Sequence, residues 1–231
     1  MIPIRDENPS ATVPIVTRAL IAANAAAFVY ELLLGPRIND LFYEYGMVPL
    51  RLTMALDGAE PPLAPALTFV TSMFLHGGWM HLIGNMWYLW IFGDNLEDRM
   101  GRVRFLVYYL LGGLAASAIQ YALHVDSRAP TVGASGAIAA VLGGYAVLFP
   151  GARVHTLLPL FPFFQVVPLP AVLVLGLWFV LQFFSGALAL GAGASGGVAW
   201  WAHIGGFAFG LIAVRMFMRR PRPASGAWIE S

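Results

Sequence analysis

Residues 132–149, VGASGAIAAVLGGYAVLF, form an uncharged run that opens on the stretch Gly133-Ala134-Ser135-Gly136. Small residues at helix interfaces let transmembrane helices pack closely, so helix packing is the simplest explanation of this stretch. A serine hydroxyl between glycines is also accessible to another group, which would allow Ser135 to act as a nucleophile. The stretch alone does not decide between the two, because GxSG is a short pattern in a chain with 25 glycines.

The composition of the chain is that of a polytopic membrane protein. Of its 231 residues, 59% are hydrophobic and 11% are charged, and the mean hydropathy is +0.73; a soluble domain carries about 25% charged residues. The absence of cysteine excludes disulfides, cysteine–zinc sites and a cysteine nucleophile. The net charge is only +1, and the scattered arginines form no basic face. Nucleic acid is therefore not expected as a partner.

Six apolar segments are candidates for membrane spans, and they cover residues 13–34, 79–92, 105–123, 132–149, 171–190 and 198–218. The connection over residues 35–77 is too apolar for a solvated linker and is broken by prolines. We therefore expect it to lie partly in the membrane interface, where aromatic residues are common. The sequence predicts an all-α membrane protein, which is a six-transmembrane helical bundle with a long, partly membrane-inserted first loop.

The distribution of arginine predicts the orientation of this bundle. An even number of spans puts both termini on one side, and ten of the thirteen basic residues then share that side: Arg5, Arg18, Arg99, Arg102, Arg104, Arg153, Arg215, Arg219, Arg220 and Arg222. By the positive-inside rule both termini are cytoplasmic. We thus expect a cytoplasmic N-terminal tail over 1–12, a six-span domain over 13–218 and a cytoplasmic Arg-rich C-terminal tail over 219–231.

Four polar side chains fall at a similar depth in this bundle. At a rise of about 1.5 Å per residue, Ser135 and His203 lie roughly 6 and 7 Å below the outer ends of their helices. His81 and Asn85, in the second span, lie about 5 and 10 Å below the start of theirs. A single histidine or asparagine at such a depth usually makes an interhelical hydrogen bond. Four from three helices instead favour a shared polar cavity.

The four residue types complete a hydrolytic site. A serine hydroxyl needs a neighbouring base to become a nucleophile, and His203 is the available base. His81 and Asn85, four residues apart on one helical face, could donate N–H groups to an oxyanion, together with the backbone N–H of Ser135. No carboxylate lies at this depth to orient His203, because Asp94, Glu97 and Asp98 lie at the opposite face. The site would therefore be a Ser–His dyad.

With these residues the chain resembles the rhomboid family of intramembrane serine proteases, in its basic six-span bacterial form. The resemblance extends from about Val13 to Met218, so 13–218 would be a rhomboid-like catalytic domain. Its motifs are, in chain order, HGGWMHLIGN at 76–85 for the HxxxN element, Glu97-Asp98-Arg99 for ExR, GASG at 133–136 for GxSG, and AHIGG at 202–206 for the motif of the last span.

The resemblance implies that Ser135 is the nucleophile and His203 the general base, with His81 and Asn85 as oxyanion-hole candidates. Structural roles are implied for six motif residues: Glu97, Arg99, Gly133, Gly136, Gly206 and Gly210. Some members have an aromatic residue four positions after the nucleophile, stacked on the base, whereas this chain has Ala139. The loop over 187–197 would be a lid, and the fifth span, with Trp178 and Phe179, a lateral gate.

The function implied is that of a serine endopeptidase that cleaves transmembrane segments of other membrane proteins near the outer face. Its partners would be the lipid bilayer and single-pass or polytopic membrane-protein substrates. It would be a multi-pass protein of the cell (inner) membrane. No cofactor is expected, and no metal ion, because the five histidines include no HExxH motif.

Two other classes of function remain open at this stage. A rhomboid-like pseudoprotease binds transmembrane helices without cleaving them, but such proteins typically lack the dyad that Ser135 and His203 form here. A small transporter or channel could use the polar cluster as a relay. The sequence has no internal repeat and no acidic residue at mid-depth, so it does not favour that class.

Overall fold

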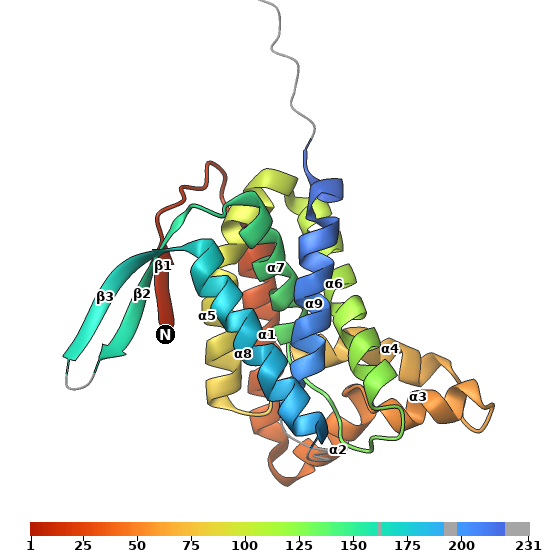
Figure 1. Ribbon diagram of the computed structural model, residues 1–231. Helices are drawn as coiled ribbons and strands as arrows, with labels where there is room; N and C mark the ends of the chain where they lie inside the picture. The colour runs from red at the N-terminus through yellow and green to blue at the C-terminus, as the bar shows by residue number, and fades with distance from the viewer. Residues whose placement is uncertain (161–162, 192–197, 220–231) are drawn as a thin grey trace, which may run out of the picture.

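The computed structural model describes residues 1–160, 163–191 and 198–219, and it is a helical bundle with one small sheet (Figure 1). The helices are α1 (Ile15–Leu34), α2 (Ile38–Tyr45), α3 (Pro49–Leu56), α4 (Leu63–Thr71), α5 (Trp79–Met100), α6 (Arg102–Leu123), α7 (Ser135–Leu148), α8 (Ala171–Gly191) and α9 (Trp200–Ala213). Three short 3-10 helices are η1 (Gly35–Arg37), η2 (Ser72–Phe74) and η3 (Val214–Phe217). The residues 192–197 of the expected lid and 220–231 of the expected C-terminal tail lie outside the described part.

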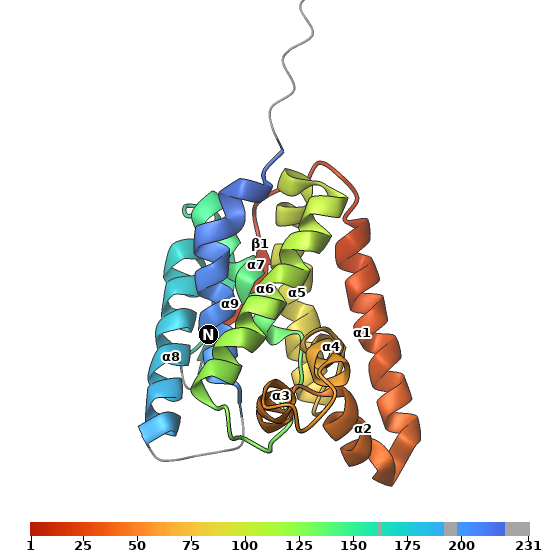
Figure 2. The same cartoon turned by 90° about the vertical axis from the view of Figure 1, so that its right-hand side faces the viewer.

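The bundle is arranged around α7. This helix is buried from Gly136 to Tyr145, and α5, α6, α8 and α9 surround it (Figures 1 and 2). It has 14 residues whereas α6 has 22, so the two helices are about 21 and 33 Å long. In Figure 1 α7 stops well short of the end that α6 and α8 reach. Its first residue, Ser135, therefore begins the helix inside the bundle.

Glycines let α7 and α9 approach until their backbones touch. A Cβ on Gly206 of α9 would overlap the carbonyl oxygen of Gly136 of α7, and a Cβ on Gly210 would overlap that of Ala140. A Cβ on Gly136 would in turn lie 2.5 Å from the Cβ of Ala116 in α6. In lipid the hydrophobic effect does not drive helices together, and close packing over small residues is instead a source of helix association.

Glu97 joins α5 to the start of α1. Its carboxylate accepts the backbone N–H of Val16 at 2.9 Å, the N–H of Thr17 at 2.8 Å and the Thr17 hydroxyl at 2.8 Å. A carboxylate at a helix N-terminus is stabilised by the unpaired N–H groups and by the helix dipole, which explains how Glu97 can be buried. Arg99 lies over the ring of Phe149, 5.8 Å from its centroid.

The long first loop is largely helical. It contains η1, α2, α3, α4 and η2, which gather at one end of the bundle (Figure 2). The buried carboxylate of Glu31 in α1 accepts the backbone N–H of His76 at 3.0 Å and so fixes the end of this loop just before α5. The depth of these helices in a bilayer stays a prediction.

The prediction of an all-α protein is wrong at one place, because the chain also forms a three-stranded antiparallel sheet of order β1-β2-β3. The strands are β1 (Ile2–Asp6), β2 (Arg153–Leu160) and β3 (Phe163–Pro170). Proline disfavours a helix in this segment. Pro168 and Pro170 lie on β3, an edge strand with a neighbouring strand on one side only, and proline is tolerated in such strands although it has no N–H. β2 and β3 thus pair antiparallel along their length and precede α8.

The N-terminal segment is attached to the bundle. Asp6 pairs with Val154 of β2, Trp87 of α5 donates its ring N–H to the carbonyl of Pro3 at 2.6 Å, and the Ser10 hydroxyl donates to Asp94 at 2.6 Å. Residues 1–12, which the sequence predicted as a cytoplasmic tail, are thus held against α5 and β2, and their location in the cytoplasm stays a prediction.

Four helical stretches in the described residues are long and apolar enough to cross a membrane: Ile15–Tyr45, Arg102–Leu123, Ala171–Leu190 and Trp200–Phe217. The chain is thus a multi-pass membrane protein of mostly helical fold. The two other expected spans are α5 and α7. They differ from these four stretches because α5 ends in a charged segment and α7 is short. The count of six stays a prediction at these two helices.

The contact between α7 and α9 predicts that Gly206→Ala destabilises the bundle. The added Cβ meets the Gly136 carbonyl, and overpacking of this kind costs about 1–3 kcal/mol. Thermal unfolding in detergent should show a lowered Tm. Gly84→Ala is the matched control, because a Cβ at this exposed position of α5 has no neighbour within 4 Å. Equal Tm values for the two variants would refute the close approach of α7 and α9.

Asp6 is a second test of the fold, through pH. Its carboxylate accepts the Tyr145 hydroxyl at 2.6 Å. Burial raises the pKa of Asp6 from 3.8 to about 6, against the effect of the Tyr145 hydrogen bond, and Asp94 adds to the rise. A raised carboxyl pKa stabilises the fold most below pH 3.8, and this stability is lost as the pH rises through about 6.

We therefore expect Asp6→Asn to remove one component of the pH dependence and to stabilise the protein above pH 6 relative to wild type. The full shift would be worth about 3 kcal/mol, and partial exposure to water reduces this to about 1 kcal/mol. Tm measured from pH 4 to pH 8 checks this. Asp40→Asn, at an exposed position of α2, should leave the pH dependence unchanged; if Asp6→Asn does the same, the prediction fails.

Candidate active site

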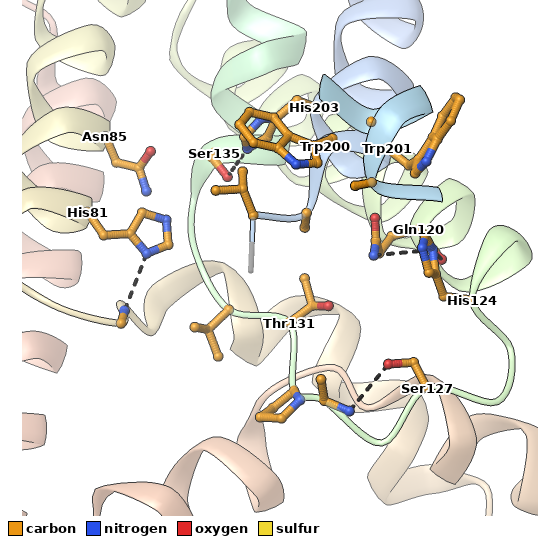
Figure 3. Close-up of a pocket in the computed structure, with 18 of the residues that line it drawn as sticks. His81, Asn85, Gln120, His124, Ser127, Thr131, Ser135, Trp200, Trp201 and His203 are labelled. Atoms are coloured by element: carbon orange, nitrogen blue, oxygen red, sulfur yellow. Dashed lines mark hydrogen bonds between the residues drawn. The ribbon is translucent and has the colours of Figure 1, made fainter. Parts of the chain in front are cut away.

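A cavity of about 540 Å³ lies at the N-terminal ends of α7 and α9, and polar side chains from four helices reach its wall (Figure 3). α5 contributes His81 and Asn85, α7 contributes Ser135, and α9 contributes His203. α6 contributes Gln120, near its C-terminal end. The cavity forms there because α7 begins inside the bundle, so that the loop before it lines a space that the longer helices enclose.

Ser135 and His203 are joined by a hydrogen bond. The Ser135 Oγ lies 2.8 Å from the His203 Nε2, which is within the range of a strong O–H to N contact. Both residues stand near the starts of their helices, and the backbone contact of Gly206 with Gly136 sets the distance between these helices. The sequence proposed this pair, and the structure brings the two side chains together across the contact between α7 and α9.

The other side of His203 is in contact with α8. The His203 Nδ1 lies 2.6 Å from Oε1 of Gln182, and the Trp178 ring lies 5.8 Å from the imidazole, tilted by 35°. Aromatic neighbours of the base thus come from α8 and, with Trp200 at 6.2 Å, from α9 itself, whereas Ala139 of α7 provides none. Phe179 stacks on Phe207 of α9, with 4.9 Å between the ring centroids.

Sequence reasoning missed Gln182, although a signal was present. Within residues 171–190 the only amide or hydroxyl side chains are Gln182 and Ser185. A polar side chain in the middle of a membrane helix usually faces the bundle interior or a cavity. The pattern therefore marked the position, and what it did not give was the partner, which depends on the rotation of α8 against α9.

His81 and Asn85 lie on the opposite side of Ser135 from His203 (Figure 3). The Nδ1 of His81 accepts the Gly77 backbone N–H at 3.3 Å, so in the neutral ring the proton is on Nε2 and can be donated. The Nδ2 of Asn85 is buried and has no hydrogen-bond partner among the described residues. Two donors are thus available, one from each side chain.

Gly133 gives these donors room. A Cβ at this position would lie 2.7 Å from Nε2 of His81 and 3.6 Å from Nδ2 of Asn85, so both donors lie against its backbone two residues before Ser135. Its φ of +128° is unfavourable for any other residue. Its N–H donates to the carbonyl of Ser72 at 2.8 Å, which holds the loop in place. The N–H of Ser135 begins α7 and has no acceptor earlier in that helix.

The described part of the chain contains no group of three or more histidine, aspartate or glutamate side chains that could hold a metal ion. Of the described residues that line the cavity, none is acidic. His81, His124 and His203 are its titratable side chains.

The fold and site define a class, a multi-pass membrane protein with a hydrogen-bonded serine and histidine in a cavity inside its helical bundle. Comparison with protein families identifies the family within this class, since the Rhomboid domain model matches residues 65–220. The chain belongs to the rhomboid family.

Among curated proteins, the chain is similar to presenilin-associated rhomboid-like protein A, mitochondrial, of Danio rerio, with 34% identity over 71% of this chain and 42% of that protein. It is 31% identical to the presenilin-associated rhomboid-like protein, mitochondrial, of Homo sapiens over 75% of this chain and 44% of that protein. It is 30% identical to rhomboid protein 1, mitochondrial, of Saccharomyces cerevisiae over 70% and 47% of the two chains. The chain therefore spans less than half the length of these relatives.

Proposed function

We propose that this protein is an intramembrane serine endopeptidase, which cleaves transmembrane segments of other membrane proteins near the outer face. The observation that carries the proposal is the 2.8 Å contact between Ser135 Oγ and His203 Nε2 at the wall of a cavity within a membrane bundle. Membership of the rhomboid family supports the same reaction class. The substrates would be single-pass or polytopic membrane proteins, and no cofactor takes part.

The mechanism begins with proton transfer from the Ser135 hydroxyl to His203 Nε2, while Ser135 Oγ attacks the carbonyl carbon of the scissile peptide bond. His203 then gives the proton to the leaving amine. Water in the cavity hydrolyses the resulting acyl-enzyme, with His203 again acting as base. The cavity, at about 540 Å³, has room for water next to the dyad.

The oxyanion of each tetrahedral intermediate would bind beside Gly133. The donors there are Nε2 of His81, Nδ2 of Asn85 and the backbone N–H of Ser135. The unpartnered Nδ2 of Asn85 supports this role, since a buried donor without an acceptor is costly unless a ligand uses it. Four glycines act on the site only through backbone packing: Gly133, Gly136, Gly206 and Gly210. Glu97 acts only through its hydrogen bonds to the start of α1, and Arg99 only through its contact with Phe149.

The alternative, a protein that binds transmembrane helices without cleaving them, would need neither the Ser135–His203 contact nor free donors beside it. A transporter or channel would favour acidic groups along its path, and the described lining of the cavity has no acidic residue. Both observations favour the enzyme.

The first test is labelling of the purified protein with a fluorophosphonate probe, in which Ser135 Oγ displaces fluoride. We expect labelling of wild type and none of Ser135→Ala or His203→Ala. Asn85→Ala should keep the dyad but slow labelling by roughly 10²-fold or more, as loss of one oxyanion donor does. Thermal unfolding confirms that each variant is folded. Equal labelling of wild type and Ser135→Ala, or no labelling of folded wild type, would favour the helix-binding alternative.

We further propose that α1, α5, α6, α7, α8 and α9 with η3 form six spans, with 13–218 as the catalytic domain, in the cell (inner) membrane. Both termini would be cytoplasmic, so that segments 1–12 and 219–231 lie inside the cell. The excess of arginine on this side supports the orientation. In this orientation the cavity would lie near the outer face.

This orientation can be measured directly, because the chain has no cysteine. Single cysteines at two exposed positions, Ala11→Cys and Asp126→Cys, report on opposite ends of the bundle. In intact cells a membrane-impermeant maleimide should label Asp126→Cys, and it should label Ala11→Cys only after permeabilisation. The reverse result would invert the proposed topology.

A further inference from the structure

We propose that Gln182 is a positioning residue for His203, which fixes the imidazole in the tautomer that can act as a base. This inference rests on the proposed function of the dyad. The amide oxygen Oε1 of Gln182 lies 2.6 Å from Nδ1 of His203, while Nε2 on the other side of the ring lies 2.8 Å from Ser135 Oγ. The imidazole is thus held between an amide and the nucleophile.

The chemistry of the two ring nitrogens requires such a partner. A neutral imidazole carries one proton, so Nε2 can accept from Ser135 only when the proton is on Nδ1. The other tautomer puts the proton on Nε2 and cannot take one from the serine. An amide oxygen is purely an acceptor, and its contact with Nδ1 therefore favours the productive tautomer. In serine proteases with a triad, a carboxylate has this task.

Other groups near His203 do not replace the amide. The described lining of the cavity contains no aspartate or glutamate, and its other titratable side chains, His81 and His124, make different contacts. The Trp178 ring restricts the plane of the imidazole without hydrogen-bonding to Nδ1. Among the described residues, the tautomer thus depends on Gln182.

Gln182 is presented by a helix different from those that carry the dyad. Trp178, Gln182 and Gly186 are spaced by four residues, so they form one face of α8. A Cβ on Gly186 would lie 3.0 Å from the Cβ of Trp200, which indicates that this face packs against the start of α9. His203 therefore has its full set of partners only while α8 is seated on α9. A displacement of α8 would expose the site and at the same time release Nδ1.

Fluorophosphonate labelling tests the role of Gln182. Gln182→Met keeps an unbranched side chain but has no acceptor oxygen for Nδ1, and it should lower the maximal labelling rate at least about 10-fold, since loss of the correct tautomer in a triad costs up to about 10⁴-fold. The probe concentration for half-maximal rate should be unchanged, because the probe does not bind to Gln182. Gln165→Met is the matched control at an exposed position of β3, and it should label as wild type does.

Gln182→Glu is the conservative variant, because a carboxylate is also an acceptor. It should keep the maximal rate within about tenfold of wild type at alkaline pH, by the same tautomer argument. A carboxylate favours the protonated imidazole, which is inactive as a base, so the low-pH limb of the labelling profile should move to higher pH. An unmoved limb would mean that the side chain at position 182 does not contact Nδ1 of His203.

The outcomes separate the two proposals. Folded wild type that is not labelled would overturn the dyad itself. Labelled wild type together with an unchanged rate in Gln182→Met would overturn the role of Gln182 alone. If Gln182→Met fails to fold, the pH profile of Gln182→Glu decides, and an unmoved low-pH limb then overturns the inference.

Discussion

The distance between α7 and α9 is the constraint on which the site depends. Where Gly206 has no side chain, the carbonyl of Gly136 occupies the space, so main chain sets the separation of the two helices. Backbone is much less adaptable than a flexible side chain, and this separation is accordingly well defined. A serine at the start of one helix and a histidine near the start of the other then meet at hydrogen-bond distance.

The length of α7 provides the second condition for the proposed hydrolysis, which is access for water. A helix of 14 residues covers about 21 Å of a hydrocarbon layer about 30 Å thick. The missing length becomes the loop before Ser135 and the cavity beside it. Polar backbone in such a loop is tolerated at membrane depth because it lines a cavity instead of facing lipid.

Much of this arrangement could be predicted because it follows from position along helices. The depths of His81, Asn85, Ser135 and His203 come from counting residues, and glycines mark where helices touch. Gln182 could not be assigned a role in this way, because its contact with His203 depends on how α8 is rotated. The strands β2 and β3 were not predicted for another reason: their sequence is apolar and interrupted by prolines, which excludes a helix but does not indicate the strand pairing.

The sheet joins segments that are made at very different times. β1 pairs with residues 154–157, so about 150 residues must be added before the first strand has a partner. At roughly 5–20 residues per second this delay is about 8–30 s. Pairing between such distant segments also closes a long loop, which slows folding. The strand made first during translation is therefore among the last parts of the protein to reach its final place.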